Sequence, residues 1–538
     1  MINITKKILF AVVAVGSFSC TTIEEEKYTI MDEMINPVSR DVTIDITAVN
    51  QTIDGFSASD CWSGNFVGQY WDDSERSQIA EWLFSQGVDD DKNPLGIGLS
   101  MWRFNLGGGT SEQGADSNIS DETRRAECFL NADGTYDWTK HAGQRYFLER
   151  AVAEGCESFV MFSNSPPVHY TKNGKGYSSS GSYGNLQDDC YDDFAEYIGT
   201  VLQHFKDEEG IEFAYISPVN EPQYDWSSSN QEGSGWQNSE VKTLAQEIDK
   251  SITSRNLSTQ ILVNESADYR YLYETSNSDG RKNCAKQLFY TESDNYIGDI
   301  SSVAPIIAAH GYWVDGNWDL LEYSRQAVRE RVDMYDIKLY QTEWSMLGDN
   351  YDDDNVYPGH DDATYLDIAL HMSKVMHHDL VNANVSSWSY WVAMDTESWS
   401  HKNRFLLIML NPYDSNSDLS LGGTGDATKT LWVLGNYSRF IRPNYKRVDH
   451  SMDTETEYFF GSSYLSPEGD KLVVVYTNLT GIMVQPKITI EGGKKIKSGV
   501  RYITDTDNDL KLIDDIEDVD KDLKVEGESV VTFVFDLE

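Results

Sequence analysis

"AYISPVNEPQYDW", residues 214–226, runs from apolar residues into a carboxylate with no turn residue between them. Residues 213–221 predict a buried strand that ends at Glu221. The stretch "KLYQTEWS", residues 338–345, has the same form, with Glu343 near the end of a second apolar strand. Parallel strands present their carboxyl ends at one edge of the sheet, so we expect these two glutamates to face one site.

Apolar runs alternate with amphipathic helical stretches throughout residues 53–439. Besides the two quoted, the predicted strands are 53–59, 99–107, 158–166, 260–266, 306–313 and 386–393. Buried strands that each precede a helix predict a parallel sheet, and eight such units are typical of a (β/α)8 TIM barrel. A doubly wound open sheet is the alternative, although no glycine-rich dinucleotide loop follows the first strand.

The sequence changes character at about residue 440. Residues 440–538 form short β-runs separated by Gly, Asp and Lys, which predicts an antiparallel sandwich. Residues 39–52 are also strand-like, and we expect them to complete this sandwich from the other end of the chain. The predicted fold class is therefore α/β, a catalytic (β/α)8 barrel over 53–439 with a β-sandwich domain built from both chain ends.

Residues 1–20 have the pattern of an export signal. Lys6 and Lys7 precede a short apolar run, small residues and Cys20, and the run is too short to span a bilayer. The cysteine and the "TTIEEE" that follows it resemble the surface-export signal of Bacteroidetes lipoproteins, which implies lipidation at Cys20, a tether over 21–38 and a lipid anchor in the outer membrane or at the cell surface of a Gram-negative bacterium. A simple secretory peptide is the alternative, because Ser17 stands where such signals usually carry leucine.

Charge and cysteine content narrow the choice of partners. A formal net charge of -45 excludes nucleic acid, because the phosphates would be repelled. The other five cysteines are widely spaced and form no CxxC metal pattern. One disulfide is possible among them, but the sequence does not indicate which two would pair: Cys61, Cys128, Cys156, Cys190 and Cys284. Residues 505–512 begin like a calcium loop but lack its glycine, so we predict a turn there. We expect neither a metal nor a cofactor.

A pair of carboxylates facing one pocket is what hydrolysis of a glycosidic bond requires. One carboxyl must be protonated to release the leaving oxygen, and the other must be ionised to attack the sugar carbon. In the retaining geometry the two groups lie about 5 Å apart. The sequence therefore predicts that Glu221 and Glu343 form such a pair.

The Asn-Glu-Pro sequence at 220–222, after the fourth predicted strand, with a second glutamate after the seventh, resembles the clan of retaining glycosidases on (β/α)8 barrels. The resemblance implies that Glu221 is the acid/base, that Glu343 is the nucleophile and that Asn220 bonds the sugar 2-hydroxyl.

Two further motifs match the same clan. In "HGYW" the resemblance implies that His310 faces the site and that Tyr312 bonds the nucleophile and keeps it ionised. In "WRFN" it implies that Arg103 also steadies the nucleophile. A nearby cation or hydrogen-bond donor favours an ionised carboxylate, which agrees with these roles.

Residues 40–538 as a whole resemble glycoside hydrolase family 30. Five stretches look most like its endo-β-1,6-galactanase branch: 53–62, 102–114, 124–129, 162–174 and 217–226. The resemblance implies a retaining hydrolase of β-1,6-galactan, such as the side chains of arabinogalactan. Residues 386–399 lack the arginine of glucuronoxylan-cleaving members, so that activity is not expected.

Alternatives remain open at this point. A β-1,6-glucanase or another β-glycosidase of the family would use the same pair of glutamates. From a different class, a non-catalytic surface lipoprotein would hold glycan through its tryptophans without cleaving it. In each case the expected partners are a poly- or oligosaccharide and surface glycan-binding proteins.

Other polar and aromatic residues follow the predicted strands. Glu265 is a third carboxylate, for which we predict a salt-bridge or subsite role rather than catalysis. We expect further sugar contacts, with core packing or a loop role as the competing interpretation, at Asp60, Trp62, Asn164, Trp344 and Trp391.

Overall fold

The computed structural model describes residues 38–180, 183–228, 230–275, 280–347, 363–397, 404–519 and 523–538. The predicted signal peptide, Cys20 and nearly all of the predicted tether lie outside these residues. Among the described residues no helix is both long and apolar enough to cross a membrane. The five cysteines from Cys61 to Cys284 are all free thiols.

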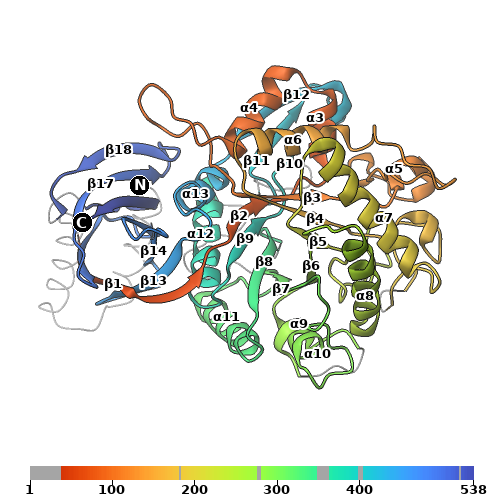
Figure 1. The fold of residues 1–538 in the computed structure, drawn as a ribbon. Coiled ribbons are helices and arrows are strands. Elements are labelled where there is room, and N and C mark those ends of the chain that lie inside the picture. Colours follow the sequence, from red (N-terminus) through yellow and green to blue (C-terminus); the bar gives the residue numbers. More distant parts are fainter. Residues whose placement is uncertain are drawn as a thin grey trace, which may run out of the picture.

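Eight parallel strands form the barrel in the order β2-β9-β8-β7-β6-β5-β4-β3. A bridge between Ser59 and Arg103 joins β2 to β3, the two ends of this order, and closes the sheet. Every strand overlaps a predicted one, and the prediction of a (β/α)8 barrel is confirmed (Figure 1). The strands are β2 (Gly55–Ala58), β3 (Met101–Asn105), β4 (Ser158–Phe162), β5 (Tyr215–Ser217), β6 (Gln260–Ser266), β7 (Val303–His310), β8 (Lys338–Trp344) and β9 (Ser387–Tyr390).

Helices pack around the outside of this sheet because each carries one apolar face. In α7, Phe194, Ile198 and Val201 recur at helical spacing and are fully buried. The helices are α3 (Ser63–Tyr70), α4 (Asp73–Phe84), α5 (Thr110–Gln113), α6 (Ala142–Ala153), α7 (Tyr191–His204), α8 (Asn238–Ser254), α9 (Arg270–Tyr273), α10 (Cys284–Phe289), α11 (Trp318–Asp333), α12 (Tyr365–Val381) and α13 (Lys429–Ser438).

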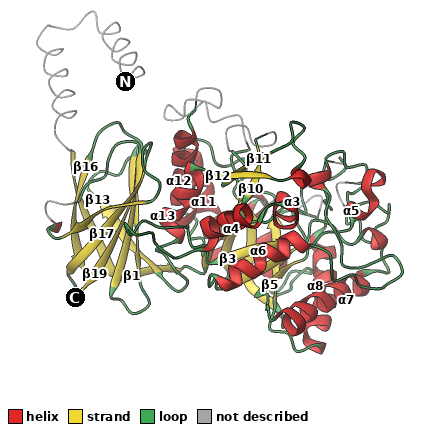
Figure 2. Ribbon diagram, turned by 90° about the horizontal axis from the view of Figure 1, so that it is seen from above, coloured by secondary structure: helices red, strands yellow, loops and turns green. Residues whose placement is uncertain are grey.

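The second domain is a β-sandwich to which both chain ends contribute, as predicted (Figures 1 and 2). Its N-terminal strand β1 lies inside the sheet, antiparallel to β13 and parallel to β16. Alternate residues of β1 from Val42 to Ile46 are buried, which is the pattern of a strand with one face on a core. The strands are β1 (Val38–Thr52), β13 (Lys446–Met452), β14 (Phe459–Leu465), β15 (Lys471–Asn478), β16 (Val484–Glu491), β17 (Ile496–Thr504), β18 (Lys511–Ile516) and β19 (Ser529–Leu537).

Helices α12 and α13 lie between the barrel and the sandwich (Figure 1). Nearly all of α12 is buried, because it packs on the barrel on one side and on the sandwich on the other. Polar contacts join the layers, since the Ser373 hydroxyl is 2.6 Å from that of Thr477 and the Thr532 hydroxyl donates to the Asn436 carbonyl at 2.8 Å. The two domains therefore share one continuous interface.

Two features of the barrel mouth differ from the expected pattern. Strand β5 ends at Ser217, so Glu221 lies on the loop beyond the strand rather than at its last residue. A small sheet of β10 (Met394–Thr396), β11 (Ile408–Pro412) and β12 (Gly423–Ala427) follows the last barrel strand. The apolar runs that predicted the eight strands gave no sign of these shorter ones.

A buried ion pair fixes α12 to the barrel, and its loss is predicted to destabilise the fold. Asp379 accepts hydrogen bonds from Arg325 Nε at 2.8 Å, Tyr269 at 3.0 Å and Trp388 Nε1 at 2.9 Å. Asp379→Ala leaves the guanidinium buried without its carboxylate, so we expect the free energy of unfolding to fall by about 3–5 kcal/mol. Denaturant unfolding followed by circular dichroism measures this.

The matched control is Asp333→Ala on α11, which removes the partner of Arg329 from an exposed ion pair. Surface pairs of this kind contribute little, so the unfolding midpoint should stay close to that of the unaltered protein. Equal effects of the two substitutions would contradict the importance given to Asp379.

Candidate active site

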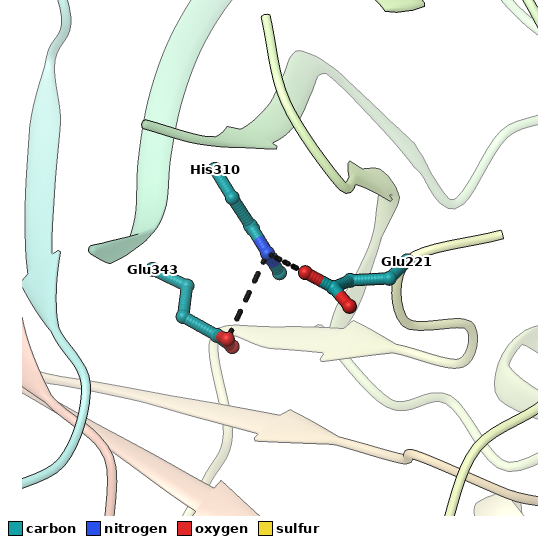
Figure 3. A group of neighbouring side chains, drawn as sticks. All are labelled: Glu221, His310 and Glu343. Atoms are coloured by element: carbon teal, nitrogen blue, oxygen red, sulfur yellow. Dashed lines mark hydrogen bonds and ion pairs between the residues drawn. The ribbon is translucent and has the colours of Figure 1, made fainter. Parts of the chain in front are cut away.

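The predicted site residues meet at the carboxyl ends of the barrel strands. Arg103 lies in the middle of β3, His310 ends β7 and Glu343 is the penultimate residue of β8. His310 and Glu343 are direct partners across the β7–β8 pair. Glu221 approaches from the loop after β5 (Figure 3).

The two glutamates lie close together across the barrel mouth. One carboxylate oxygen of Glu221, one of Glu343 and a ring nitrogen of His310 all lie within 4.8 Å of one another. Both glutamates are buried, with 6% and 5% of their surfaces exposed. The separation of the oxygens suits the short spacing that a retaining glycosidase requires, about 5 Å.

Donors surround the carboxylate of Glu343. Arg103 Nη1 donates to Oε2 at 2.8 Å, and the Tyr312 hydroxyl donates to Oε1 at 3.0 Å. His310 Nδ1 lies 3.7 Å from Oε1. Burial and the nearby carboxylates raise the pKa of Tyr312 well above its usual value, so its hydroxyl keeps the proton that it donates. These contacts stabilise negative charge on Glu343.

The environment of Glu221 favours the protonated form. Burial raises the pKa of this carboxyl, the charge of Glu343 raises it further, and the hydrogen bond with His310 Nδ1 at 3.0 Å opposes both. Its backbone has a φ of 42°, in the left-handed region that non-glycine residues rarely adopt. Such strained residues cluster at functional sites, where the surrounding structure holds them in place.

Glu221, Glu343 and Tyr312 line a pocket of about 280 Å³, whereas Arg103 and His310 are outside its lining. Of the predicted sugar contacts, Asn220, Trp62 and Trp391 also line it, and the two indoles meet edge to face with centroids 5.0 Å apart. The Asn220 side-chain oxygen accepts from Arg103 Nη2 at 3.5 Å.

Three other predicted contacts lie outside the pocket lining. The Trp344 ring is buried in the core, where its Nε1 donates to Asp315 at 2.7 Å. Asp60 is buried and accepts from the Asn105 amide at 2.9 Å, while burial raises its pKa to about 7. Asn164 is also buried.

Arg124 and Asp395 form a polar wall that sequence reasoning did not assign. Arg124 Nη2 lies 3.4 Å from Asp395 Oδ2, and the guanidinium lies over the Trp62 ring at 3.7 Å. Both residues line the pocket. The pair offers hydrogen-bond donors and acceptors with balanced charge, which suits the hydroxyl groups of a neutral ligand.

An aromatic pair at the pocket mouth was also missed. Tyr224 and Trp313 are 41% and 42% exposed, and their rings are parallel within 3° with centroids 6.4 Å apart. The sequence could have indicated both as site residues, because Tyr224 lies three residues after Glu221 and Trp313 follows Tyr312. The remaining lining residues missed from the sequence are Trp226, Gln231, Leu347, Val392 and Phe405.

Among the described residues, one group has the spacing of metal ligands, formed by Glu221, His310 and Glu343. The chemistry of His310 does not suit a metal. Nδ1 lies 3.0 Å from Glu221 and Nε2 3.1 Å from Glu265, and the surrounding carboxylates raise its pKa to about 10 despite burial. Each ring nitrogen is thus engaged by a carboxylate, and the imidazolium form that these carboxylates favour has no lone pair for a metal. At residues 505–512, Asp505 accepts from the amides of Asp507 and Asn508 in a turn.

Comparisons with known proteins agree with this geometry. A family described as O-Glycosyl hydrolase family 30 matches residues 39–403. A protein of Hypocrea rufa named endo-beta-1,6-galactanase is 25% identical over 455 residues, 81% of each chain. The structure of a conserved exported protein from Bacteroides fragilis is 30% identical, with a TM-score of 0.84 over 92% of this chain and 99% of that one. The catalytic domain of xylanase C from Talaromyces cellulolyticus is 19% identical, with a TM-score of 0.64 over the same shares.

The protonation of His310 can be measured directly. With a pKa of about 10, its imidazolium should show both ring nitrogens protonated at pH 8 in nitrogen NMR spectra. The raised pKa stabilises the fold fully below the ordinary value of 6.5, and this stabilisation is lost as the pH rises through about 10.

His377 on α12 is the control, because burial lowers its pKa to about 3. Its ring should stay neutral throughout the same titration. A neutral His310 at pH 8 would contradict the ion-pair network described above.

Proposed function

Because the chain belongs to O-glycosyl hydrolase family 30, we propose that it is a retaining β-glycosidase whose catalytic pair is Glu221 and Glu343. The observation that carries this proposal is the approach of their carboxylate oxygens to within 4.8 Å in one buried pocket. Their surroundings differ in the way that the mechanism needs, with Glu221 held as an acid and Glu343 held among donors.

In the first step Glu343 attacks the anomeric carbon of the bound sugar. The bond from that carbon to the leaving oxygen breaks, and Glu221 gives its proton to the departing oxygen. The product is a glycosyl ester on Glu343 together with a free alcohol. Arg103 and Tyr312 hold the attacking carboxylate in one orientation, which lowers the entropic part of the barrier.

In the second step water replaces the leaving group. Glu221, now ionised, takes a proton from the water as its oxygen attacks the anomeric carbon, and the ester bond to Glu343 breaks. Two inversions at one carbon return the original β configuration. Both carboxyl groups then have their starting protonation states.

We propose a β-1,6-linked galactan as the substrate, cleaved within the chain. The similarity to the Hypocrea rufa protein over 81% of the chain supports this choice. The Arg124–Asp395 pair and the tryptophans beside it suit a neutral sugar, which presents hydroxyls at its edge and C–H groups on its face.

We also propose that the protein is exported as a lipoprotein anchored through Cys20. The N-terminal sequence supports this placement, as does the likeness to a Bacteroides fragilis protein described as exported. A polymeric glycan is too large to enter most cells, so an enzyme that cuts it would act at the cell surface.

Substitution of the two glutamates tests the catalytic assignment. We expect Glu343→Ala to lower the turnover of de-arabinosylated arabinogalactan by about four orders of magnitude or more, because no other group can form the ester. Glu221→Ala should cost about 10²–10⁴-fold with an unactivated leaving group and less with a dinitrophenyl β-galactoside, which leaves without a proton.

Added azide identifies the two roles. It should restore turnover in both variants, giving a product of inverted configuration with Glu343→Ala and of retained configuration with Glu221→Ala. If the unaltered protein and both variants bound galactan equally and none cleaved any β-glycoside, a glycan-binding lipoprotein would replace the enzyme.

The pair of Tyr224 and Trp313 should bind the chain beyond the cleaved bond, because Tyr224 lies on the loop of the proposed acid. Loss of a stacked ring costs about 1 kcal/mol or more, so Trp313→Ala should raise KM for galactan roughly 5- to 10-fold. Hydrolysis of a short aryl galactoside should change less. Tyr323→Ala on α11, exposed and outside the pocket lining, is the control and should change neither reaction.

A further inference from the structure

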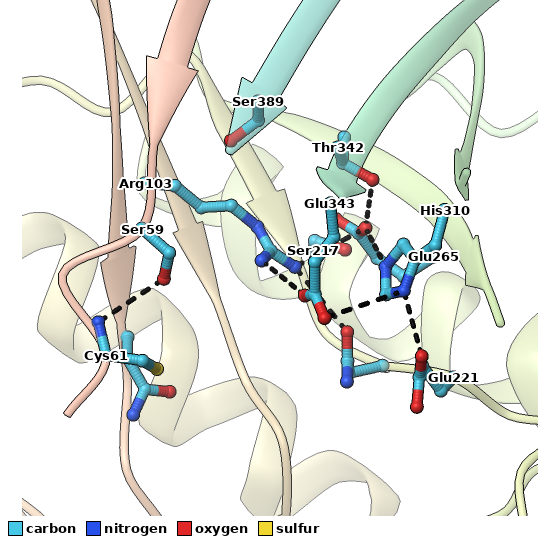
Figure 4. Close-up of polar contacts among 12 residues, drawn as sticks. Ser59, Cys61, Arg103, Ser217, Glu221, Glu265, His310, Thr342, Glu343 and Ser389 are labelled. Carbon is cyan, nitrogen blue, oxygen red and sulfur yellow. Dashed lines mark hydrogen bonds and ion pairs between the residues drawn. The ribbon is translucent and has the colours of Figure 1, made fainter. Parts of the chain in front are cut away.

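Glu265 is a buried carboxylate that the proposed mechanism does not use. It lies within β6, has no exposed surface and does not line the pocket. Its Oε2 accepts from His310 Nε2 at 3.1 Å and from the Thr342 hydroxyl, and it lies 3.4 Å from Arg103 Nη2 (Figure 4). A carboxylate buried this deeply is stable only with such partners.

Glu265 is connected to Glu221 in two ways. His310 bridges them, with Nε2 on Glu265 and Nδ1 on Glu221. The backbone amide of Glu221 also donates to the carbonyl oxygen of Glu265 at 2.9 Å. Both glutamates have positive φ angles, 42° and 48°, so this hydrogen bond joins two residues with left-handed backbones.

The charges around Glu221 balance only when its carboxyl is neutral. Arg103 and protonated His310 supply two positive charges, and Glu265 and Glu343 supply two negative ones. The pKa of Glu265, lowered to about 2 mainly by Arg103 and His310 against the effect of burial, keeps it ionised. A net charge in a buried site is costly, so this balance favours a proton on Glu221.

Four other titratable groups lie near this cluster, and none of them is altered by the substitutions described below. Tyr312 and Cys61 have pKa values raised well above their usual ranges and stay neutral. Asp268, which adds to the negative potential at Glu221, is itself paired with Arg270 at 2.9 Å. Asp60 accepts from the Asn105 amide, and burial raises its pKa to about 7.

We propose that Glu265 is a positioning residue that keeps the acid, Glu221, protonated: its negative charge offsets the positive charges of Arg103 and His310, which alone would favour an ionised Glu221, and so completes the neutral charge count. The proposal rests on the catalytic roles proposed above for Glu221 and Glu343. It assigns to the third carboxylate of the site a role in proton supply that involves no contact with the sugar.

Glu265→Gln separates this role from a structural one. Glutamine keeps the shape of the side chain and an oxygen that can accept from His310 and Thr342, but it removes one negative charge. The cluster then carries one excess positive charge. It becomes neutral by losing a proton, and this loss occurs at a lower pH than in the unaltered protein. That proton comes from Glu221 rather than His310, because a carboxyl is ordinarily more acidic than an imidazolium.

The experiment compares the pH dependence of kcat/KM for an alkyl β-galactoside in the unaltered protein, Glu265→Gln, Glu265→Asp and Thr342→Val. The descending alkaline limb reports the acid in the free enzyme. We expect Glu265→Gln to move this limb to lower pH by about one unit or more. Glu265→Asp keeps the charge, and Thr342→Val removes only a neutral donor, so both should keep the limb close to its original position.

A second prediction concerns the leaving group. A dinitrophenyl galactoside needs no proton, so its hydrolysis above the shifted limb should fall much less in Glu265→Gln than hydrolysis of the alkyl galactoside. A uniform loss with both substrates and an unmoved limb would show that Glu265 serves only the fold, and would overturn the proposal.

Titration of the Glu221 carboxyl by carbon NMR provides a test that needs no turnover. Its pKa should be lower in Glu265→Gln than in the unaltered protein, and an unchanged value would also overturn the proposal. If the unaltered protein cleaved no β-glycoside, the proposed function would fail, while this titration would still decide the charge coupling.

Discussion

One buried guanidinium holds the interior of the barrel mouth together. Arg103 is 1% exposed and contacts Glu343 at 2.8 Å, Glu265 at 3.4 Å and Asn220 at 3.5 Å. Its flat face lies over the Phe162 ring at 3.6 Å, which fixes the plane in which its donors point. Without this cation, Glu265 and Glu343 would share a space with little water and only His310 as a counter-charge. The arrangement of the proposed catalytic pair thus depends on a residue of β3, a strand that is adjacent neither to β5 nor to β8.

Much of the fold could be predicted from the sequence, because barrel strands are covered on both faces and appear as apolar runs. The closeness of Glu221 and Glu343 followed from barrel closure. Trp344 shows the limit of this reasoning. It adjoins Glu343 in the sequence, and we expected a sugar contact there, but it does not line the pocket. Successive side chains on a strand point to opposite faces, so an inward Glu343 sends Trp344 into the surrounding core. Adjacency to a site residue on a strand therefore argues against membership of the site.

The pocket walls could not be predicted in this way. Arg124 and Asp395 come from connecting segments, whose sequences have no periodicity and whose paths depend on the rest of the fold. A salt bridge was among the roles predicted for Glu265, but its partners could not be named from the sequence, because only the meeting of β3, β6 and β7 brings Arg103 and His310 to it. Local patterns specify the elements, whereas the electrostatics of the site arises from residues brought together from distant segments.

The placement of β1 has a consequence for how this chain can be divided. This strand lies between β13 and the edge strand β16, so a fragment cut from the C-terminal hundred residues would leave β16 without its partner strand and expose one edge of β13. Such a fragment would be prone to self-association rather than to independent folding. During synthesis β1 is made long before β13 and β16, so it cannot pair with them until nearly the whole polypeptide has emerged. The small domain therefore cannot finish folding before the large one has been synthesised.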